Sequence, residues 1–251
     1  MQLTKTQFPR EVQKLKSMMD EELWDLLADF ECILAGGALT SMLSGKEVND
    51  LDVYFRDKQS LQKVIEAIYN RDVPFTSAHI ISYTDKSILL QSNGNMVQFI
   101  AFDYFHDMEY LFDSFDYTIN MVGVNMADEQ VEMHPDCLKH IAQRYLHFNP
   151  GTAYPLISML RVAKYKEKGY NISKQQLFKL MLAINSLNLN SWDEMIHHIG
   201  GMYGTAPKDI FDTTVPFSLD TAIEMLDNCK MGASVMPSSI TQEELAEQFK
   251  F

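Results

Sequence analysis

Residues 33–55 read ILAGGALTSMLSGKEVNDLDVYF, and this stretch decides the fold expected for the chain. An apolar run ends in the pair Gly36 and Gly37, and about two helical turns follow it. A second apolar strand then carries Asp50 and Asp52. Residues i and i+2 of a strand point to the same face, so the two carboxylates are expected to project side by side.

The carboxylate pair indicates a cation site. Asp50 and Asp52 would repel each other at this spacing, and the arrangement is costly unless a cation lies between them. Oxygen-only ligands suit a hard divalent ion, which we expect to be Mg2+ or Mn2+. Leu51 and Val53 should face the opposite way, into a core. The alternative is that both acids are simply solvated at the edge of a sheet.

The two glycines indicate a phosphate site. Gly36 and Gly37 let the backbone come close to a ligand, and the helix that follows them offers free N–H groups at its start. Together with the carboxylates, they point to a metal-bound nucleoside triphosphate.

The order of these motifs resembles the polymerase-beta-type nucleotidyltransferase superfamily, and within it the CCA-adding enzymes and bacterial poly(A) polymerases. That resemblance implies an α+β fold, with a nucleotidyltransferase-type mixed β-sheet flanked by helices and followed by a helical C-terminal subdomain. The likeness covers roughly residues 33–170. The positions that match the first family motif are Gly36, Gly37, Ala38, Gly45, Asp50 and Asp52.

A second stretch resembles another motif of the same branch, Arg-Arg-Asp-Phe-Thr-Ile-Asn. Asp116 and Asn120 match it, and the resemblance implies that they lie along the sugar and phosphates of the bound nucleotide. The two arginines are absent, and Ser114 and Phe115 stand in their places. The alternative for Asp116 and Asn120 is turn chemistry before a strand.

Two further pairs complete the expected site. Thr40 and Ser41 would help the glycines to cradle the phosphates, although the family usually has Arg-Asp there. The helix expected over residues 155–170 resembles the neck helix of the branch, which implies contacts from Arg161 and Lys164 to the base or triphosphate. These two cations are three residues apart and share one helix face. The alternative, stronger for Lys164, is a solvated basic stripe.

Residues 149–152, Asn-Pro-Gly-Thr, are a turn signal that separates two expected parts of the chain. We predict an α/β nucleotidyltransferase-like domain over residues 1–150, beginning with a helix over residues 9–30. Residues 151–251 are predicted to be helical, with a last helix opening at Thr241.

Two local patterns are expected within the first domain. Asn93-Gly94 lies between two apolar or alternating runs and predicts a tight hairpin turn. A further strand is predicted over residues 118–126.

Composition limits the possible partners. The chain has 251 residues and a net charge of -13, which argues against a broad nucleic-acid footprint. No apolar run reaches the roughly 20 residues that span a bilayer, so no membrane contact is expected. The three cysteines are far apart, and the first residues do not resemble a secretion signal, so a reducing, cytoplasmic compartment is expected.

The leading hypothesis is a metal-dependent nucleotidyltransferase that uses an NTP, expected to be ATP or CTP. The resemblance implies a tRNA-like RNA 3′ end as the acceptor, held through a local basic patch; a protein hydroxyl or a small molecule stays open. Asp50 and Asp52 would be the catalytic metal ligands. The second hypothesis is a nucleotide-binding or protein-interaction module on a degenerate scaffold, which the absent arginines favour. The oligomeric state is left open.

Overall fold

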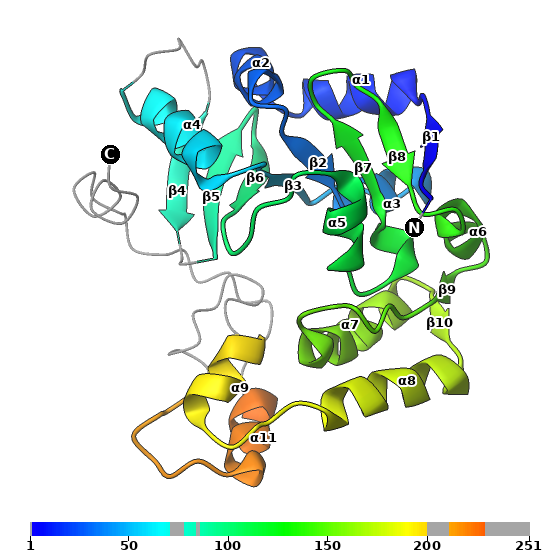
Figure 1. The fold of residues 1–251 in the computed structure, drawn as a ribbon, viewed down its shortest axis with the longest axis vertical. Helices are drawn as coiled ribbons and strands as arrows, with labels where there is room; N and C mark the ends of the chain where they lie inside the picture. The colour runs from blue at the N-terminus through cyan, green and yellow to red at the C-terminus, as the bar shows by residue number, and fades with distance from the viewer. Residues whose placement is uncertain (1, 71–77, 84–85, 200–210, 229–251) are drawn as a thin grey trace.

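A computed structural model describes residues 2–70, 78–83, 86–199 and 211–228. Its centre is an eight-stranded mixed sheet in the order β1-β8-β7-β2-β3-β6-β5-β4 (Figure 1). Only the β3–β6 pair among these strands is parallel. The strands are β1 Thr4–Thr6, β2 Ile33–Ala35, β3 Asp50–Tyr54, β4 His79–Tyr83, β5 Ser87–Ser92, β6 Asn95–Ile100, β7 Val122–Asn125 and β8 Val131–Met133.

Helices cover the sheet and continue beyond it, so the predicted α+β class is confirmed. In Figure 1, α1, α2 and α4 lie along the top of the sheet, and α7 and α8 lie below it. The helices are α1 Pro9–Ser17, α2 Glu21–Asp29, α3 Gly37–Leu43, α4 Lys58–Asn70, α5 Met108–Asp113, the 3-10 turn η1 Thr118–Asn120, α6 Cys137–Ala142, α7 Pro155–Glu167, α8 Lys174–Asn185, α9 Trp192–Ile199 and α11 Leu219–Asn228.

Two cores pack against opposite faces of the sheet. The larger core joins alternate strand residues, such as Leu51 and Val53, to the apolar sides of α1, α2 and α4. The smaller core contains Ile33, Ala35 and Tyr54 and is covered by α5. Leu51 and Val53 are fully buried, which confirms the alternation predicted for this strand. Asp50 and Asp52 therefore share the face of Tyr54.

The prediction of one helix over residues 9–30 is wrong, because the helix is interrupted between α1 and α2. The β5–β6 hairpin explains the break. The backbone N–H of Asp20 donates to Ser92 Oγ at 2.8 Å, and Asn93 Nδ2 donates to the carbonyl of Met19 at 2.7 Å. Backbone groups that would extend the first helix are thus used to dock it onto the hairpin.

The hairpin itself follows from its turn residues. Asn93 and Gly94 have φ angles of 47° and 76°, and Ser92 pairs with Asn95 across the turn. Positive φ at both central positions is the requirement of the tight hairpin turn that Asn-Gly favours, so this prediction is confirmed.

The sequence patterns did not predict the shortest elements correctly. The strand β1 and the parallel pair β9 Tyr145–Leu146 and β10 Asn171–Ile172 were not predicted. The strand predicted from residue 118 begins only at Val122, because η1 forms first. Neighbouring chain, rather than an apolar pattern of their own, holds these pieces in place.

The helices after residue 150 divide between two cores. The larger core includes Val162 and Tyr165 of α7 and Leu180 of α8. In contrast, α9 and α11 pack around Trp192 in a separate small core. The helix predicted to open at Thr241 lies outside the described residues. No helix among those described is long and apolar enough to cross a membrane.

Candidate active site

The Gly-Gly turn brings backbone to the wall of a cavity. β2 ends at Ala35 and α3 begins at Gly37. Gly36 lies between them, with a φ of +93° and a ψ of -133° that suit glycine. The Gly36 N–H donates to the carbonyl of Val122 at 3.1 Å, which fixes the turn against β7. A Cβ placed on Gly36 would lie 3.8 Å from Asp52 Oδ2 and 3.9 Å from the Phe115 ring. The turn therefore faces both a carboxylate and an aromatic ring.

The carboxylate pair lies on the neighbouring strand, β3. Asp50 is exposed and Asp52 is half-buried. Burial, and then the charge of Asp50, raise the pKa of Asp52 to about 7, against the opposing influence of Arg161 and Lys164. Within the described part of the chain, no group donates a hydrogen bond to Asp52. Its negative charge is therefore poorly compensated by the protein.

A closed ring of polar side chains forms the other end of the cavity. Arg161 Nη1 lies 2.9 Å from Asp116 Oδ2, and Arg161 Nη2 donates to the Tyr165 hydroxyl at 2.7 Å. The Tyr165 hydroxyl donates to Asn120 Oδ1 at 2.9 Å, and Asn120 Nδ2 donates to Asp116 Oδ1 at 3.1 Å. The ring joins the segment that precedes β7 to helix α7, and all its members except Arg161 are buried.

One oxygen in this ring keeps its accepting capacity. Asp116 Oδ2 is buried and in contact with the Arg161 guanidinium, but their approach lacks hydrogen-bond geometry. Burial raises the pKa of Tyr165 to about 12, so its hydroxyl keeps its proton in the physiological range. The ring is thus charge-neutral overall, and among the described residues Asp116 Oδ2 accepts no hydrogen bond.

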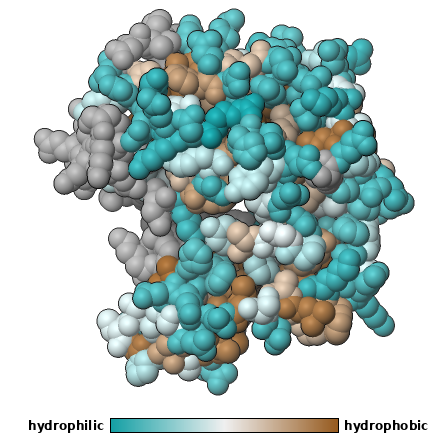
Figure 2. Space-filling model, viewed as in Figure 1, coloured by the Kyte–Doolittle hydropathy of each residue, from teal (hydrophilic) through white to brown (hydrophobic). Residues whose placement is uncertain are grey.

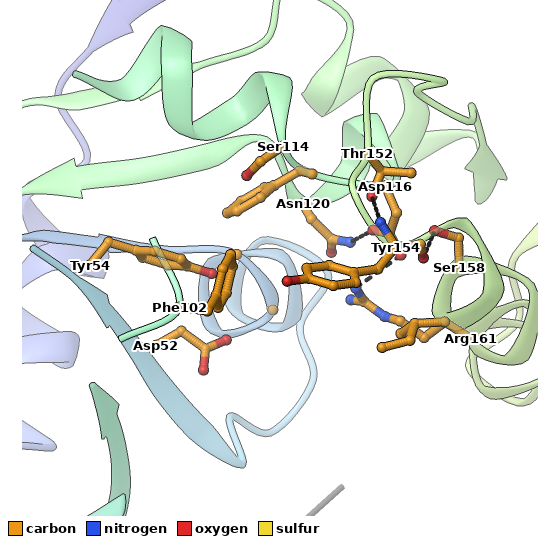
Figure 3. A pocket seen from close by; sticks show the side chains of 14 residues that line it. Asp52, Tyr54, Phe102, Ser114, Asp116, Asn120, Thr152, Tyr154, Ser158 and Arg161 are labelled. Atoms are coloured by element: carbon orange, nitrogen blue, oxygen red, sulfur yellow. Dashed lines mark hydrogen bonds and ion pairs between the residues drawn. The ribbon is translucent and has the colours of Figure 1, made fainter. Parts of the chain in front are cut away.

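The glycine turn, the carboxylate end and the ring end line one cavity of about 190 Å3 (Figure 3). The space-filling view shows the surface hollowed where the sheet part meets the helices below it (Figure 2). The lining residues are Gly36, Gly37, Asp52, Tyr54, Phe102, Ser114, Phe115, Asp116, Asn120, Thr152, Tyr154, Ile157, Ser158 and Arg161.

The fold brings most of the predicted site residues to this cavity. Those that line it are Gly36, Gly37, Asp52, Asp116, Asn120 and Arg161. Asp50 and Lys164 are exposed beside it, close enough to shift the pKa of Asp52. Ser41 is buried outside the lining, and Thr40 uses its hydroxyl proton within the fold, donating to the carbonyl of Ile119 at 2.6 Å. The roles predicted for these residues stay predictions.

Aromatic side chains, which the sequence motifs did not include, form much of the wall. Tyr54 and Phe115 have ring centroids 5.8 Å apart, and Phe102 and Tyr154 meet edge to face at 5.7 Å. In Figure 3 the rings of Tyr54, Phe102 and Tyr154 lie along the cavity beside Asp52. Two signals were available: Tyr54 continues the i, i+2 alternation of the carboxylates, and Phe115 occupies a motif arginine position.

The residues present suit a hard cation. Among the described residues, no three His, Cys, Asp or Glu side chains gather as a metal site, so Asp50 and Asp52 would be the protein's contribution. Mg2+ is commonly held by one or two carboxylates and completes its shell with waters and substrate phosphates. The uncompensated charge of Asp52 and the oxygen-only donors fit this ion.

The chain resembles proteins of one sequence family. A model of the Gabija anti-defense 2 family matches residues 8–144. A curated relative, Gabija anti-defense 2 of Bacillus phage SPbetaL7, is 38% identical over 202 residues, covering 80% of this chain and 49% of the relative. The chain thus spans about half the length of the curated relative that it matches.

The fold resembles solved structures of CCA-adding enzymes. The enzyme of Bacillus stearothermophilus in complex with CTP is 14% identical, with a TM-score of 0.51 over 77% of this chain and 49% of that one. The Thermotoga maritima enzyme complexed with a tRNA is 11% identical, with a TM-score of 0.51 over 79% of this chain and 51% of that one. At such identities the likeness shows the fold, which is the nucleotidyltransferase type predicted from residues 33–55.

Proposed function

The chain belongs to the Gabija anti-defense 2 family, and from that premise we propose that it counters the Gabija defence of the host cell. It would do so by transferring a nucleoside monophosphate from an NTP to an acceptor hydroxyl. The observation that carries the proposal is the meeting of Gly36 and Asp52 on one wall. A backbone turn on the cavity wall and a carboxylate that the protein compensates poorly suit a metal-bound polyphosphate.

Each end of the cavity would take a different part of the nucleotide. Asp50 and Asp52 would hold Mg2+ or Mn2+, which when bound neutralises phosphate charge and activates the acceptor hydroxyl. Gly36 and Gly37 would lie along the phosphates. Asp116 Oδ2, with its free accepting capacity, would take a hydrogen bond from the sugar or base.

The reaction is a displacement at the α-phosphate. The acceptor oxygen forms a new bond to phosphorus, the bond to the bridging oxygen of the β-phosphate breaks, and pyrophosphate leaves. The acceptor's proton passes to solvent. The protein's part is to position the two reacting groups in line and to balance the charge that develops on the phosphate oxygens.

The acceptor is proposed from the family name and the fold together. An RNA 3′ end is the acceptor that the CCA-adding relatives suggest, and one of them is complexed with a tRNA. The net charge of -13 limits RNA to a local contact, so a protein hydroxyl of the Gabija defence is tested beside it.

Label transfer tests the proposal directly. The purified chain would be incubated with each α-labelled NTP, Mg2+ or Mn2+, total RNA, and a lysate of cells that carry the Gabija defence. The Asp50→Asn/Asp52→Asn variant runs alongside, with Glu47→Gln as the matched control for losing a nearby exposed acid. Labelled product from the wild type and Glu47→Gln, but not from the double variant, is expected.

A binding module without catalysis is the second candidate. The Phe115 ring beside Gly36, where the family motif has an arginine, favours it because a ring cannot neutralise phosphate. Nucleotide binding that requires Mg2+, is lost in Asp50→Asn/Asp52→Asn, and yields no labelled product would select this candidate. Absence of both product and binding would overturn the site itself.

A further inference from the structure

Helix α8 presents a row of apolar side chains to solvent. Phe178, Met181 and Leu182 are each at least half exposed, and their i, i+3, i+4 spacing puts them on one face of the helix. The inner face carries Leu180, which is fully buried in the larger core. A helix that is apolar on both sides is normally covered on both sides, so the outer face of α8 has the character of an interface.

Helix α11 presents a second apolar row. Leu219 and Ile223 lie one turn apart and are both exposed, whereas Ala222 on the inner side is buried in the small core around Trp192. Five of the nine large apolar side chains that are exposed in the described part of the chain lie on α8 and α11. Figure 1 places both helices at the end of the molecule away from α1 and α2, and Figure 2 shows hydrophobic areas over that end.

The charges beside the two apolar rows are opposite in sign. Lys174 and Lys179 are exposed on α8, and none of its 12 residues is acidic. Asp220 and Glu224 are exposed on α11, each next in sequence to a residue of the apolar row, and that helix contains no lysine or arginine. In a chain with a net charge of -13, α8 is therefore a local basic face. The two faces are complementary, apolar to apolar and basic to acidic.

The two faces do not cover each other within one chain, because both are exposed in the same structure. A second copy supplies both partners at once, since a two-fold axis that places α8 of one copy on α11 of the other also forms the reciprocal pair. We propose that the chain forms a two-fold dimer through these α8–α11 contacts. None of the contact residues lines the cavity, so the dimer does not depend on nucleotide transfer.

Sedimentation velocity of the full chain over a range of concentrations tests the dimer. Phe178→Ser and Ile223→Ser each remove an exposed apolar side chain from one face, so the monomer should fold normally and the dimer Kd should rise by about tenfold or more. Leu138→Ser is the matched control, because Leu138 is exposed on α6, outside both faces, and should leave the Kd unchanged. A wild type that is monomeric at every concentration would overturn the proposal, as would equal losses in all three variants.

Charge reversal tests which helices meet. Lys174→Glu/Lys179→Glu makes α8 acidic like α11, and Asp220→Lys/Glu224→Lys makes α11 basic like α8. Each double variant alone should dimerise at least about tenfold more weakly than the wild type, because like charges then face each other. An equimolar mixture of the two should dimerise again, since every α8 then meets an α11 of opposite charge. A mixture that stays monomeric, or a double variant that dimerises alone as well as the wild type does, would overturn the pairing.

Discussion

Asp52 and Asp116 line the same cavity, yet their surroundings are opposite. Asp116 is almost fully buried and is held in a ring by Arg161 and Asn120. Asp52 is half-buried, accepts no hydrogen bond among the described residues, and has Asp50 beside it. One carboxylate is compensated by its own fold, and the other is left to be compensated from outside.

The difference separates the structural role of Asp116 from the catalytic role proposed for Asp52. A buried charge without a partner is costly, so a fold retains one where a ligand supplies the missing interaction. The ring balances the charge of Asp116 with Arg161 and holds α7 against the segment that precedes β7. Asp52 contributes little to holding the fold, and the cation proposed for this site would supply its missing partner.

The largest effect is expected from Asp52→Asn. Label transfer should fall by roughly 10²- to 10³-fold, the size seen when one electrostatic partner of a reaction centre is removed. The free energy of unfolding should stay the same or rise, because repulsion from Asp50 is relieved. Label transfer and urea denaturation would be measured on the same preparation. A marked loss of stability would contradict the contrast with Asp116.

The ring end should respond the other way to Arg161→Met. Removing the guanidinium leaves Asp116 buried with an uncompensated charge, so unfolding should become easier by about 2–3 kcal/mol, below the range for fully buried pairs because Arg161 is partly exposed. Denaturant titration measures this change. Adding Asp116→Asn should restore part of the loss; if it does not, the ion pair is not what stabilises this end.

Gly36 lies between the two ends, and Gly37 is its natural control. Gly36→Ala should destabilise by about 1–3 kcal/mol, because its φ of +93° and ψ of -133° are strained for a residue with a Cβ. Gly37→Ala, in the first turn of α3 and with no atom within 4 Å of the new Cβ, should be neutral to slightly stabilising. Thermal unfolding of both variants tests this, and equal losses would count against backbone strain.

The smallest effect is a pH dependence of stability. Because the pKa of Asp52 is about 7 in the fold and near 3.8 when unfolded, the folded state binds more protons between these values. Stability from this group is present at low pH and lost as pH rises through about 7. For a half-buried group we expect about 1 kcal/mol.

A difference between two proteins isolates this term. Several histidines titrate in the same range, so the wild type is compared with Asp52→Asn by denaturation at pH 5 and pH 8, with and without Mg2+. The wild type should lose more stability at the higher pH than Asp52→Asn does, and Mg2+ should remove this difference. An identical pH dependence in both proteins would assign the effect elsewhere.

Local patterns were sufficient for the motif strand and its turns. The alternation around Leu51 and Val53 and the Asn93-Gly94 turn depend on short-range geometry, so sequence alone predicted them. The break between α1 and α2 depends on Ser92 and Asn93, some 70 positions away, and no local pattern encodes it. Arg161, the ion-pair partner of Asp116, likewise arrives from α7 through tertiary packing.

The aromatic wall was missed for a different reason. Tyr54 and Phe102 are apolar residues at strand ends, and such residues usually enter a core. Only the cavity between β3 and α7 shows that they face a site. The motif predicts individual polar residues, whereas the aromatic wall forms from side chains that come together only in the folded structure.

The polar ring also determines which breaks in the polypeptide the fold can tolerate. Its members come from residues 116–120 on one side of the Asn149–Gly151 turn and from Arg161 and Tyr165 on the other. A protease nick at that exposed turn would leave the two pieces joined by the two ring contacts that cross it, Arg161 to Asp116 and Tyr165 to Asn120, and by a shared core. A shortened chain that stops there would instead retain the buried Asp116 without Arg161, its ion-pair partner on α7, so the turn is a poor place to divide the molecule.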